Sequence, residues 1–186
     1  SDETGPYYRL CSHYQRSKKA AENMVTSYDT RELAWSILRP GLVYGPGDTT
    51  TLKLVFDLLA SEKLPMLGGF GVYNCLIYID DLVQAIVRAL ESDNAIGEIF
   101  DIANGEKVLL RDAVSHAALS MGTPAPRHSI PKWLVSAAAY VLESLYRLPL
   151  LRGEPMITRY LATQLSWDFH FSPQKSVRLL GYAPQV

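Results

Sequence analysis

Apolar residues recur along this chain in two patterns, the spacing of a helix face and the continuous run of a buried strand. Residues 13–28 carry apolar or amphipathic side chains at intervals of three and four, which predicts a helix. The predicted face of that helix consists of Tyr14, Lys18, Ala21, Val25 and Tyr28. The next run, AWSILRPGLVYG at 34–45, is apolar and β-prone and ends in Pro and Gly, which indicates a buried parallel strand that leads into a loop.

The alternation of strands and helices continues to the end of the chain. Further helices are predicted at 52–60, 82–91, 111–121, 131–147 and 173–180, and Gly181 closes the last of them. Strands are predicted at 72–79, 98–103 and 167–171, and a turn at 66–71. Strands that alternate with helices predict an α/β sheet, and the more irregular last third predicts a smaller lobe beside it.

The composition is that of a soluble globular protein. Apolar residues make up 48% of the 186 residues and charged residues 20%, and the net charge is -1. This balance fits one core with a lobe attached, and it gives no electrostatic reason to expect nucleic acid or an acidic membrane as a partner. Cys11 and Cys75 lie far apart and lack the ligand spacing of a zinc site, so we expect a reducing, cytoplasmic protein.

The first residues of the chain are polar and turn-like. SDETGPYYRL lacks the apolar segment of a signal peptide, and the first predicted helix follows it with no strand in between. We therefore expect the chain to be the C-terminal part of a larger protein.

Tyr14 and Lys18 are the strongest candidates for chemistry. A phenol has a reference pKa of about 10 and is a poor base at neutral pH, but a nearby ammonium favours its ionised form. The i, i+4 spacing of a helix supplies that nearness and leaves donors of Lys18 for a cofactor ribose. The alternative is a half-buried aromatic side chain next to a solvated charge.

The surroundings of this pair resemble a known superfamily. HYQRSK, followed by AAE and by SILRPGLVYGPGD, is similar to the extended short-chain dehydrogenase/reductase superfamily, in which Tyr-x-x-Ser-Lys precedes a strand ending in Arg-Pro-x-x-Val-Tyr-Gly-Pro-Gly. LIYIDDLVQAIVRAL and GEIFDIANGE resemble later elements of these NAD-dependent epimerase/dehydratase enzymes. The tail, PMITRYLATQLSWDFHFSPQKSVRLLGYAP, is similar to the 3-beta-hydroxysteroid dehydrogenase-like branch.

This resemblance implies the C-terminal half of a Rossmann-type parallel sheet with a smaller, mainly helical substrate-binding lobe. The Rossmann part would comprise about 1–45 and 80–122, and the lobe about 46–79 and 123–186. The glycine-rich dinucleotide loop and the catalytic Ser or Thr of the superfamily are not found among the 186 residues. We therefore expect this piece alone to bind the cofactor poorly and to be inactive.

The resemblance also implies an NAD(P)-dependent oxidoreductase. Tyr14 would exchange a proton with the substrate, and Lys18 would bind the nicotinamide ribose and favour the ionised phenol. The residues expected to line the nicotinamide pocket, at the carboxyl end of their strand, are Pro40, Gly41, Leu42 and Val43. NAD and NADP both stay open because the residue that selects between them is not found here. A homodimer through the Tyr/Lys helix is common in the superfamily.

The expected substrate is an apolar secondary alcohol or ketone, steroid-like or lipid-like. Residues 133–151 are unusually apolar in the region where the resembling branch builds its substrate lobe. Tyr44 and Tyr73 are candidates for the entrance to the pocket, and Arg159 for an anionic substrate group, although a salt bridge is the ordinary role of such an arginine. The alternatives are a sugar-nucleotide epimerase or dehydratase and a non-catalytic nucleotide-binding member.

Three further features have structural explanations. Asp80 and Asp81 stand where a helix begins, so we expect them to cap it. The histidines at 13, 116, 128 and 170 lack ligand spacing, so we expect no metal site. We expect helix 131–147 to pack on a core or over a substrate instead of spanning a membrane, because charges interrupt it; shallow membrane contact stays open. Its predicted apolar face is Leu134, Ala138, Val141, Leu145 and Leu148.

Overall fold

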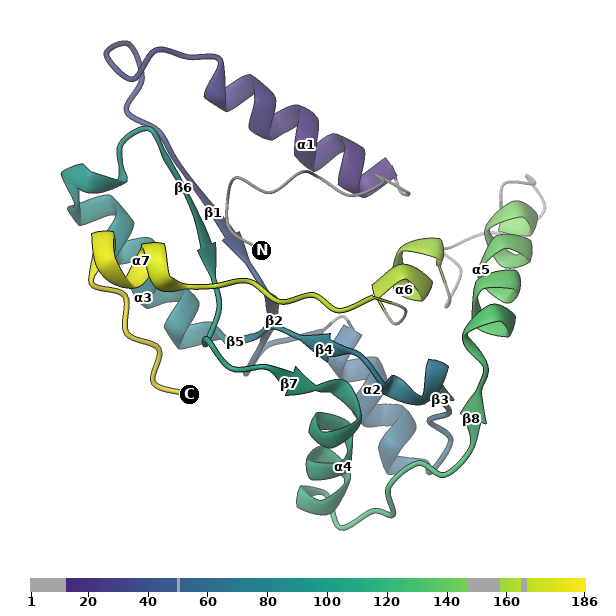
Figure 1. Ribbon diagram of the computed structural model, residues 1–186. Coiled ribbons are helices and arrows are strands. Elements are labelled where there is room, and N and C mark those ends of the chain that lie inside the picture. Colours follow the sequence, from purple (N-terminus) through teal and green to yellow (C-terminus); the bar gives the residue numbers. More distant parts are fainter. Residues whose placement is uncertain (1–12, 50, 147–157, 165–166) are drawn as a thin grey trace. The chain divides into compact units, whose positions relative to one another are not determined.

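The chain folds into two compact units, each of which combines segments that are distant in the sequence. The computed structural model describes residues 13–49, 51–146, 158–164 and 167–186 (Figure 1). The first unit consists of the described residues up to Gly47, of Cys75–Lys107 and of His170–Val186. The second unit consists of the described residues within Asp48–Asn74 and Val108–Phe169.

Parallel strands and helices alternate in the first unit. Its strands are β1 (Ser36–Pro40), β2 (Leu42–Tyr44), β5 (Leu76–Tyr78) and β6 (Glu98–Ile102). Its helices are α1 (His13–Thr26), α3 (Ile79–Glu91) and α7 (Gln174–Leu180), with a short 3-10 turn at Asp93–Ala95. β1 pairs in parallel with β6, and β2 pairs in parallel with β5. This alternation confirms the α/β prediction.

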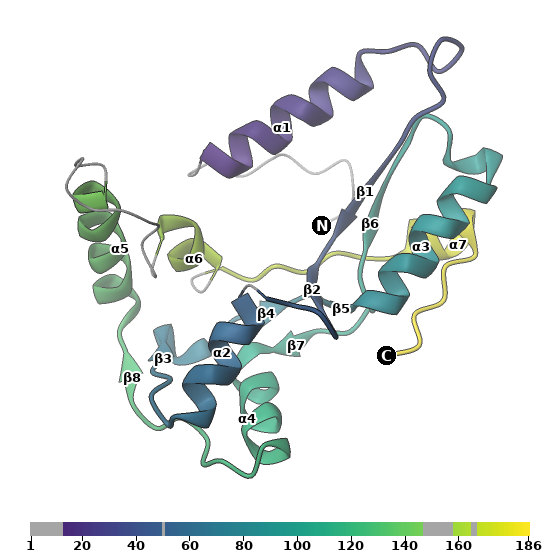
Figure 2. The same cartoon turned by 180° about the vertical axis from the view of Figure 1, so that it is seen from behind.

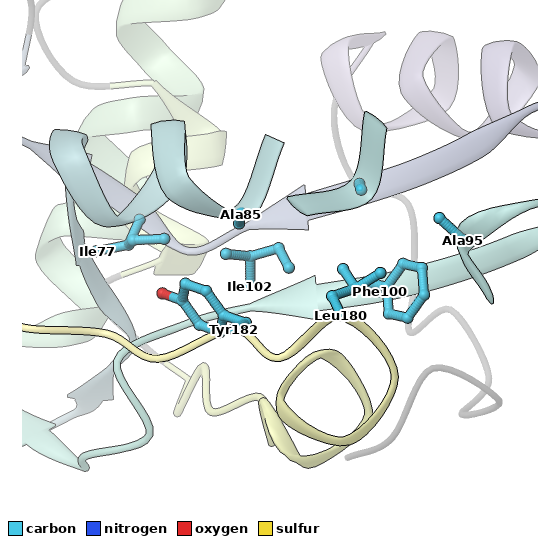
Figure 3. Packing of buried hydrophobic residues seen from close by; sticks show 8 residues of the cluster. Ile77, Ala85, Ala95, Phe100, Ile102, Leu180 and Tyr182 are labelled. Atoms are coloured by element: carbon cyan, nitrogen blue, oxygen red, sulfur yellow. The ribbon is translucent and has the colours of Figure 1, made fainter. Parts of the chain in front are cut away.

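The core of the first unit forms around β6 (Figure 3). Phe100 and Ile102 of β6 are fully buried, and they cluster with Ile77 of β5 and Ala85 of α3. The cluster is completed by Ala89, Ala95, Leu180 and Tyr182. Small alanines on α3 let the helix approach the strand closely, so that the large β6 side chains pack against it. In Figures 1 and 2, α1 lies on the other side of the β1–β6 pair from α3.

Gly41 lies at the point where the chain leaves one strand partner and joins another. Its N–H donates to the carbonyl of Ile102 at 2.9 Å, and the N–H of Leu42 donates to the carbonyl of Cys75 at 2.8 Å. A Cβ atom at position 41 would lie 2.5 Å from the Cys75 carbonyl oxygen. A glycine is therefore required for this close approach of two backbones.

The second unit is mainly helical. Its helices are α2 (Thr51–Ala60), α4 (Leu110–Ser120), α5 (Lys132–Tyr146) and α6 (Arg159–Gln164), with a 3-10 turn at Gly68–Phe70. β3 (Met66–Leu67) pairs in parallel with β8 (Ser129–Ile130), and β4 (Tyr73–Asn74) pairs antiparallel with β7 (Val108–Leu109). One cluster of buried residues comprises Leu59, Leu64, Phe70, Val114 and Ala118. A second comprises Val135, Ala139 and Ala162.

The division into units differs from the predicted boundaries at three segments. Residues 75–79 and 170–186 lie in the first unit, because β5 pairs with β2 and the segment after α7 packs on the β6 core. Residues 108–122 lie in the second unit, because Val114 and Ala118 of α4 pack against Leu59 and Phe70. The sequence pattern could not anticipate these partners, since each pairing joins residues far apart in the chain.

One predicted strand does not form, and one predicted helix face does not pack on the core. Residues 167–171 do not form a strand: the Asp168 carboxylate accepts the Tyr73 N–H at 2.8 Å, in the place of a strand carbonyl, and only the Phe169 N–H donates to the Tyr73 backbone. The predicted apolar face of α5 does not enter the core, since Leu134, Val141 and Leu145 are exposed while Val135 and Ala139 are buried. Packing of this face over a substrate stays a prediction. Leu148 lies outside the described residues, as does Arg147 at the predicted end of that helix.

The described residues include no helix with both the length and the apolar character needed to cross a membrane.

Gly41→Ala is expected to destabilise the complete protein by about 1–3 kcal/mol, the usual cost of forcing atoms into a packed site. The new Cβ would meet backbone at Cys75, which cannot rotate away as a side chain can. Gly71→Ala is the matched control, because a Cβ there has only the end of the Arg111 side chain within 4 Å, at 3.9 Å. Urea unfolding measures the stability of both variants. Equal midpoints for the two variants would contradict the close approach at position 41.

Tyr182→Phe is expected to leave stability at neutral pH unchanged or slightly increased, because within the described residues the buried Tyr182 hydroxyl has no hydrogen-bond partner. Burial, followed by the charge of Asp81, raises the pKa of Tyr182 to about 12, compared with about 10 for an exposed phenol. The neutral phenol therefore contributes its full stabilisation below about pH 10 and loses it as the pH rises through about 12.

Unfolding free energies measured between about pH 8 and 12 test the direction of this pH dependence. The wild type should lose more stability than Tyr182→Phe over that range, and Tyr28→Phe, which changes an exposed tyrosine, should follow the wild type. Parallel curves for wild type and Tyr182→Phe would show that the phenol titrates normally.

Candidate active site

Tyr14 and Lys18 lie together on an exposed face of α1. The Lys18 Nζ lies 5.5 Å from the centroid of the Tyr14 ring, within the range of a cation–π contact. The Tyr14 side chain is 56% exposed, and Lys18 is exposed as well. The predicted i, i+4 juxtaposition is therefore present, with a hydroxyl and an ammonium that a ligand can reach from solvent.

Tyr14, Lys18 and Ala21, which share the predicted face of α1, lie on its exposed side. None of the residues of α1 is buried, and Tyr14, Lys18 and Ala21 are exposed. The partly buried positions are Gln15, Lys19, Glu22 and Val25, and of these only Val25 is apolar. The inward side of α1 is thus mostly polar, and hydrophobic burial does not attach this helix to the unit.

An ion pair joins α1 to β1. Arg39 donates from Nε to Glu22 Oε2 at 3.0 Å and from Nη2 to Glu22 Oε1 at 2.7 Å, a bidentate arrangement. Lys19 Nζ lies 3.2 Å from the same carboxylate. Asp101, which faces Arg39 in the register of β1 and β6, lies 3.9 Å from Arg39 Nη1. Sequence reasoning missed this network, although a charged residue inside an apolar strand was a signal that a partner was needed.

The segment that follows Arg39 holds the predicted cofactor residues. Pro40 ends β1, Gly41 bridges the two strand pairs, and Leu42 and Val43 begin β2. Leu42 is 38% exposed and Val43 is partly buried. These residues are brought into one unit with α1, as their proposed role requires.

Tyr44 ends β2 and packs against a second tyrosine. Its ring centroid lies 5.5 Å from that of Tyr78 at an interplanar angle of 59°, a tilted aromatic pair. Burial raises the pKa of Tyr44, and the charge of Asp81 adds to this effect. The Tyr44 phenol is therefore held neutral and is able to donate a hydrogen bond.

The remaining predicted substrate residues belong to the second unit. Tyr73, in β4, is 43% exposed, which leaves its ring accessible. Arg159, at the start of α6, donates from Nε to Glu143 Oε2 at 2.6 Å, and its backbone N–H donates to Glu143 Oε1 at 2.6 Å. Its guanidinium also lies 5.3 Å from the ring centroid of Tyr140. Arg159 thus joins α6 to α5, which is the ordinary role of a paired arginine.

The predicted capping by Asp80 and Asp81 is wrong as regards hydrogen bonds. Both residues lie in the first turn of α3, but Tyr78 holds the N-cap position and no side chain caps the helix. Asp81 is buried, and its carboxylate accepts the backbone N–H groups of Gln185 at 2.8 Å and Val186 at 3.2 Å. Asp81 thus fastens the end of the chain to α3, and its carboxylate also interacts favourably with the dipole at the N-terminus of that helix.

Cys75 and His170 meet in the first unit. Cys75 Sγ lies 3.6 Å from His170 Nδ1, and the Phe171 N–H donates to the sulfur at 3.0 Å. Burial raises the pKa of the Cys75 thiol and lowers that of His170. Both shifts favour neutral forms, so the pair stays uncharged and packs as part of the fold. The described residues contain no group of three His, Cys, Asp or Glu side chains able to hold a metal ion.

Taken together, the first unit presents an exposed phenol and ammonium on one helix, a backbone segment at the carboxyl end of a parallel strand, and a neutral tyrosine just beyond it. The phenol can exchange a proton, and the ammonium can donate up to three hydrogen bonds. Ligands of α/β sheets bind outside the carboxyl ends of the strands, where Pro40–Tyr44 lie.

Comparisons with known proteins give the family of the chain. Residues 1–103 match the NAD dependent epimerase/dehydratase family. The chain is 30% identical over 177 residues to the 2-alkyl-3-oxoalkanoate reductase of Stenotrophomonas maltophilia, covering 93% of this chain and 54% of the relative. It is 28% identical to the 3beta-hydroxysteroid-dehydrogenase/decarboxylase isoform 1 of Arabidopsis thaliana, covering all of this chain and 45% of the relative.

A solved structure shows the same fold. UDP-glucuronic acid 4-epimerase from Bacillus cereus, in complex with NAD, superposes with a TM-score of 0.73 at 21% identity, over the whole of this chain and 51% of that one. The chain therefore spans about half the length of the relatives it matches. The predicted Rossmann-type fold is confirmed, and the chain belongs to the NAD-dependent epimerase/dehydratase family of extended short-chain dehydrogenases/reductases.

Proposed function

We propose that the protein containing this chain is an NAD(P)-dependent oxidoreductase in which Tyr14 is the general acid/base. The observation that carries the proposal is the exposed Tyr14–Lys18 pair on α1, with Nζ 5.5 Å from the ring centroid. Both groups reach solvent on one helix face, so a ligand can contact them at the same time. Membership of an NAD-dependent family supports the choice of cofactor.

The residues of the first unit fit a nicotinamide nucleotide. The Lys18 ammonium offers donors to a ribose diol, and the backbone of Pro40–Val43 offers donors and acceptors at the end of a parallel strand. When bound, the nicotinamide would supply the hydride acceptor or donor. Tyr14 would hold or release the proton at its hydroxyl oxygen, and Lys18 would orient the ribose.

We propose an apolar secondary alcohol or ketone as the substrate. The relatives named above are a 3-oxoalkanoate reductase and a 3-beta-hydroxysteroid dehydrogenase, whose named substrates carry a ketone or a secondary hydroxyl. In the second unit, α5 leaves Trp133, Leu134 and Val141 exposed, which offers apolar surface to a ligand. Apolar contact contributes about 25 cal/mol for each Å² of substrate surface covered.

Arg159 is a weaker candidate for substrate binding than Tyr44. Its guanidinium is engaged by Glu143, so an anionic substrate group would have to compete with a carboxylate at 2.6 Å. Tyr44, by contrast, is a neutral hydrogen-bond donor next to the proposed nicotinamide segment. A sugar-nucleotide epimerase or dehydratase is the alternative, and it would need cations for the substrate phosphates.

Assays of the complete protein test the substrate class. Hydroxysteroids, long-chain 3-oxo compounds and nucleotide-sugars should be compared with both NAD and NADP, following absorbance of the reduced cofactor or product analysis for epimerisation. We expect turnover with one of the first two classes. Turnover confined to nucleotide-sugars would replace this proposal with the alternative.

Tyr14→Phe is expected to lower kcat by about 10²- to 10⁴-fold, the usual contribution of a general acid or base. Lys18→Met should weaken cofactor binding and lower the rate as well, because it removes donors from the ribose site. Tyr28→Phe is the matched control, since Tyr28 is another exposed tyrosine just beyond α1. Wild-type turnover in Tyr14→Phe would show that the Tyr14–Lys18 pair takes no part in the reaction.

A further inference from the structure

Among the described residues, polar contacts join α1 to β1. The helix has 14 residues and none of them is buried, so apolar packing among the described residues does not fix its rotation or its height above the strands. The bidentate pair between Glu22 and Arg39 is an interaction of another kind, because two parallel hydrogen bonds define both distance and orientation. The Glu22 side chain is 11% exposed and that of Arg39 is 24% exposed, so water screens the pair only in part.

The two partners of this pair occupy particular places in the sequence. Glu22 lies one helical turn after Lys18 and two turns after Tyr14, on the same rigid helix. Arg39 lies immediately before Pro40, at the start of the segment proposed to line the nicotinamide. One ion pair therefore connects the helix that carries the proton donor with the strand that carries the cofactor-lining backbone.

The Arg39 guanidinium is itself held in place. Asp101 lies opposite Arg39 in the β1–β6 register, with its Oδ1 3.9 Å from Arg39 Nη1, and its side chain is only 3% exposed. A second carboxylate on a buried strand favours one orientation of the guanidinium fork, in which Nε and Nη2 point to Glu22. Arg39 on β1 is thus held in the orientation that binds the Glu22 carboxylate of α1.

We propose that Glu22 and Arg39 are positioning residues that set the place of Tyr14 and Lys18 relative to Pro40–Val43. This inference rests on the proposed function, because it concerns the geometry of that same reaction. A reacting group displaced by about 1 Å can cost about 10²-fold in rate. Loss of the ion pair should therefore slow the reaction through Tyr14, although neither residue touches the substrate.

The test uses Glu22→Gln in the complete protein, with Glu98→Gln as the matched control. Glu98 also forms an ion pair on the β1–β6 sheet, with Lys175 at 2.9 Å, but that pair joins β6 to α7 and not to α1. Glu22→Gln should lower kcat per folded molecule by about 10- to 100-fold. Arg39→Lys, which keeps the charge but loses the bidentate geometry, should give a smaller loss. Glu98→Gln should keep the wild-type kcat.

A double variant separates positioning from a general structural role. If Glu22 acts through Tyr14, then Glu22→Gln should cause little further loss in a Tyr14→Phe background, because residues that act as a unit are not additive. Additive losses would overturn the positioning role. A normal rate in Glu22→Gln, with the Tyr14→Phe loss intact, would overturn this inference alone, whereas a Tyr14→Phe variant with full turnover would overturn the proposed function as well.

Amide hydrogen exchange gives a readout that needs no substrate or cofactor. The amides of His13–Thr26 should exchange faster in Glu22→Gln than in the wild type, while those of β6 keep their protection. Glu98→Gln should leave α1 unchanged. Equal exchange of α1 in Glu22→Gln and the wild type would show that the ion pair does not hold the helix, and would overturn the inference.

Discussion

The exchange of strand partners at Gly41 is the constraint on which the first unit depends. The N–H of Gly41 donates to the carbonyl of Ile102 in β6, whereas the N–H of the next residue, Leu42, donates to the carbonyl of Cys75, which precedes β5. Both bonds form only because position 41 has no side chain. This crossing aligns three distant segments of the sequence, and it places Pro40–Tyr44 at and just beyond the carboxyl end of β1, where the proposed chemistry needs them.

Within this unit, apolar contacts form the core, and polar contacts attach α1 and the end of the chain. β5, β6, α3 and the residues around α7 supply the buried core, and Asp81 fastens the end of the chain onto α3. α1 contributes no buried residue and is joined to β1 by the Glu22–Arg39 pair. A helix attached in this way keeps its other face exposed, which suits the proposed contact of Tyr14 and Lys18 with a ligand.

The second unit shows how a candidate site residue can acquire a structural role. Arg159 was a candidate for an anionic substrate group, and the fold gives it a carboxylate at 2.6 Å that joins α6 to α5. The face of α5 that enters the core is the one with Val135 and Ala139, where small or branched side chains allow close packing with Ala162 of α6. Trp133, Leu134 and Val141 remain exposed.

The sequence by itself determined the order of most helices and strands, because helical spacing and apolar runs are local properties of the chain; the strand predicted at 98–103, for example, extends over Glu98–Ile102. The motif around Tyr14 and Lys18 also identified the family, since its residue order needs no tertiary contact. Only the tertiary structure decided that β2 pairs with β5, that the polar side of α1 turns inward, and that Asp81 receives the C-terminal amides. Those outcomes depend on contacts between residues far apart in the sequence, and a local pattern cannot specify which of several available surfaces a residue will meet.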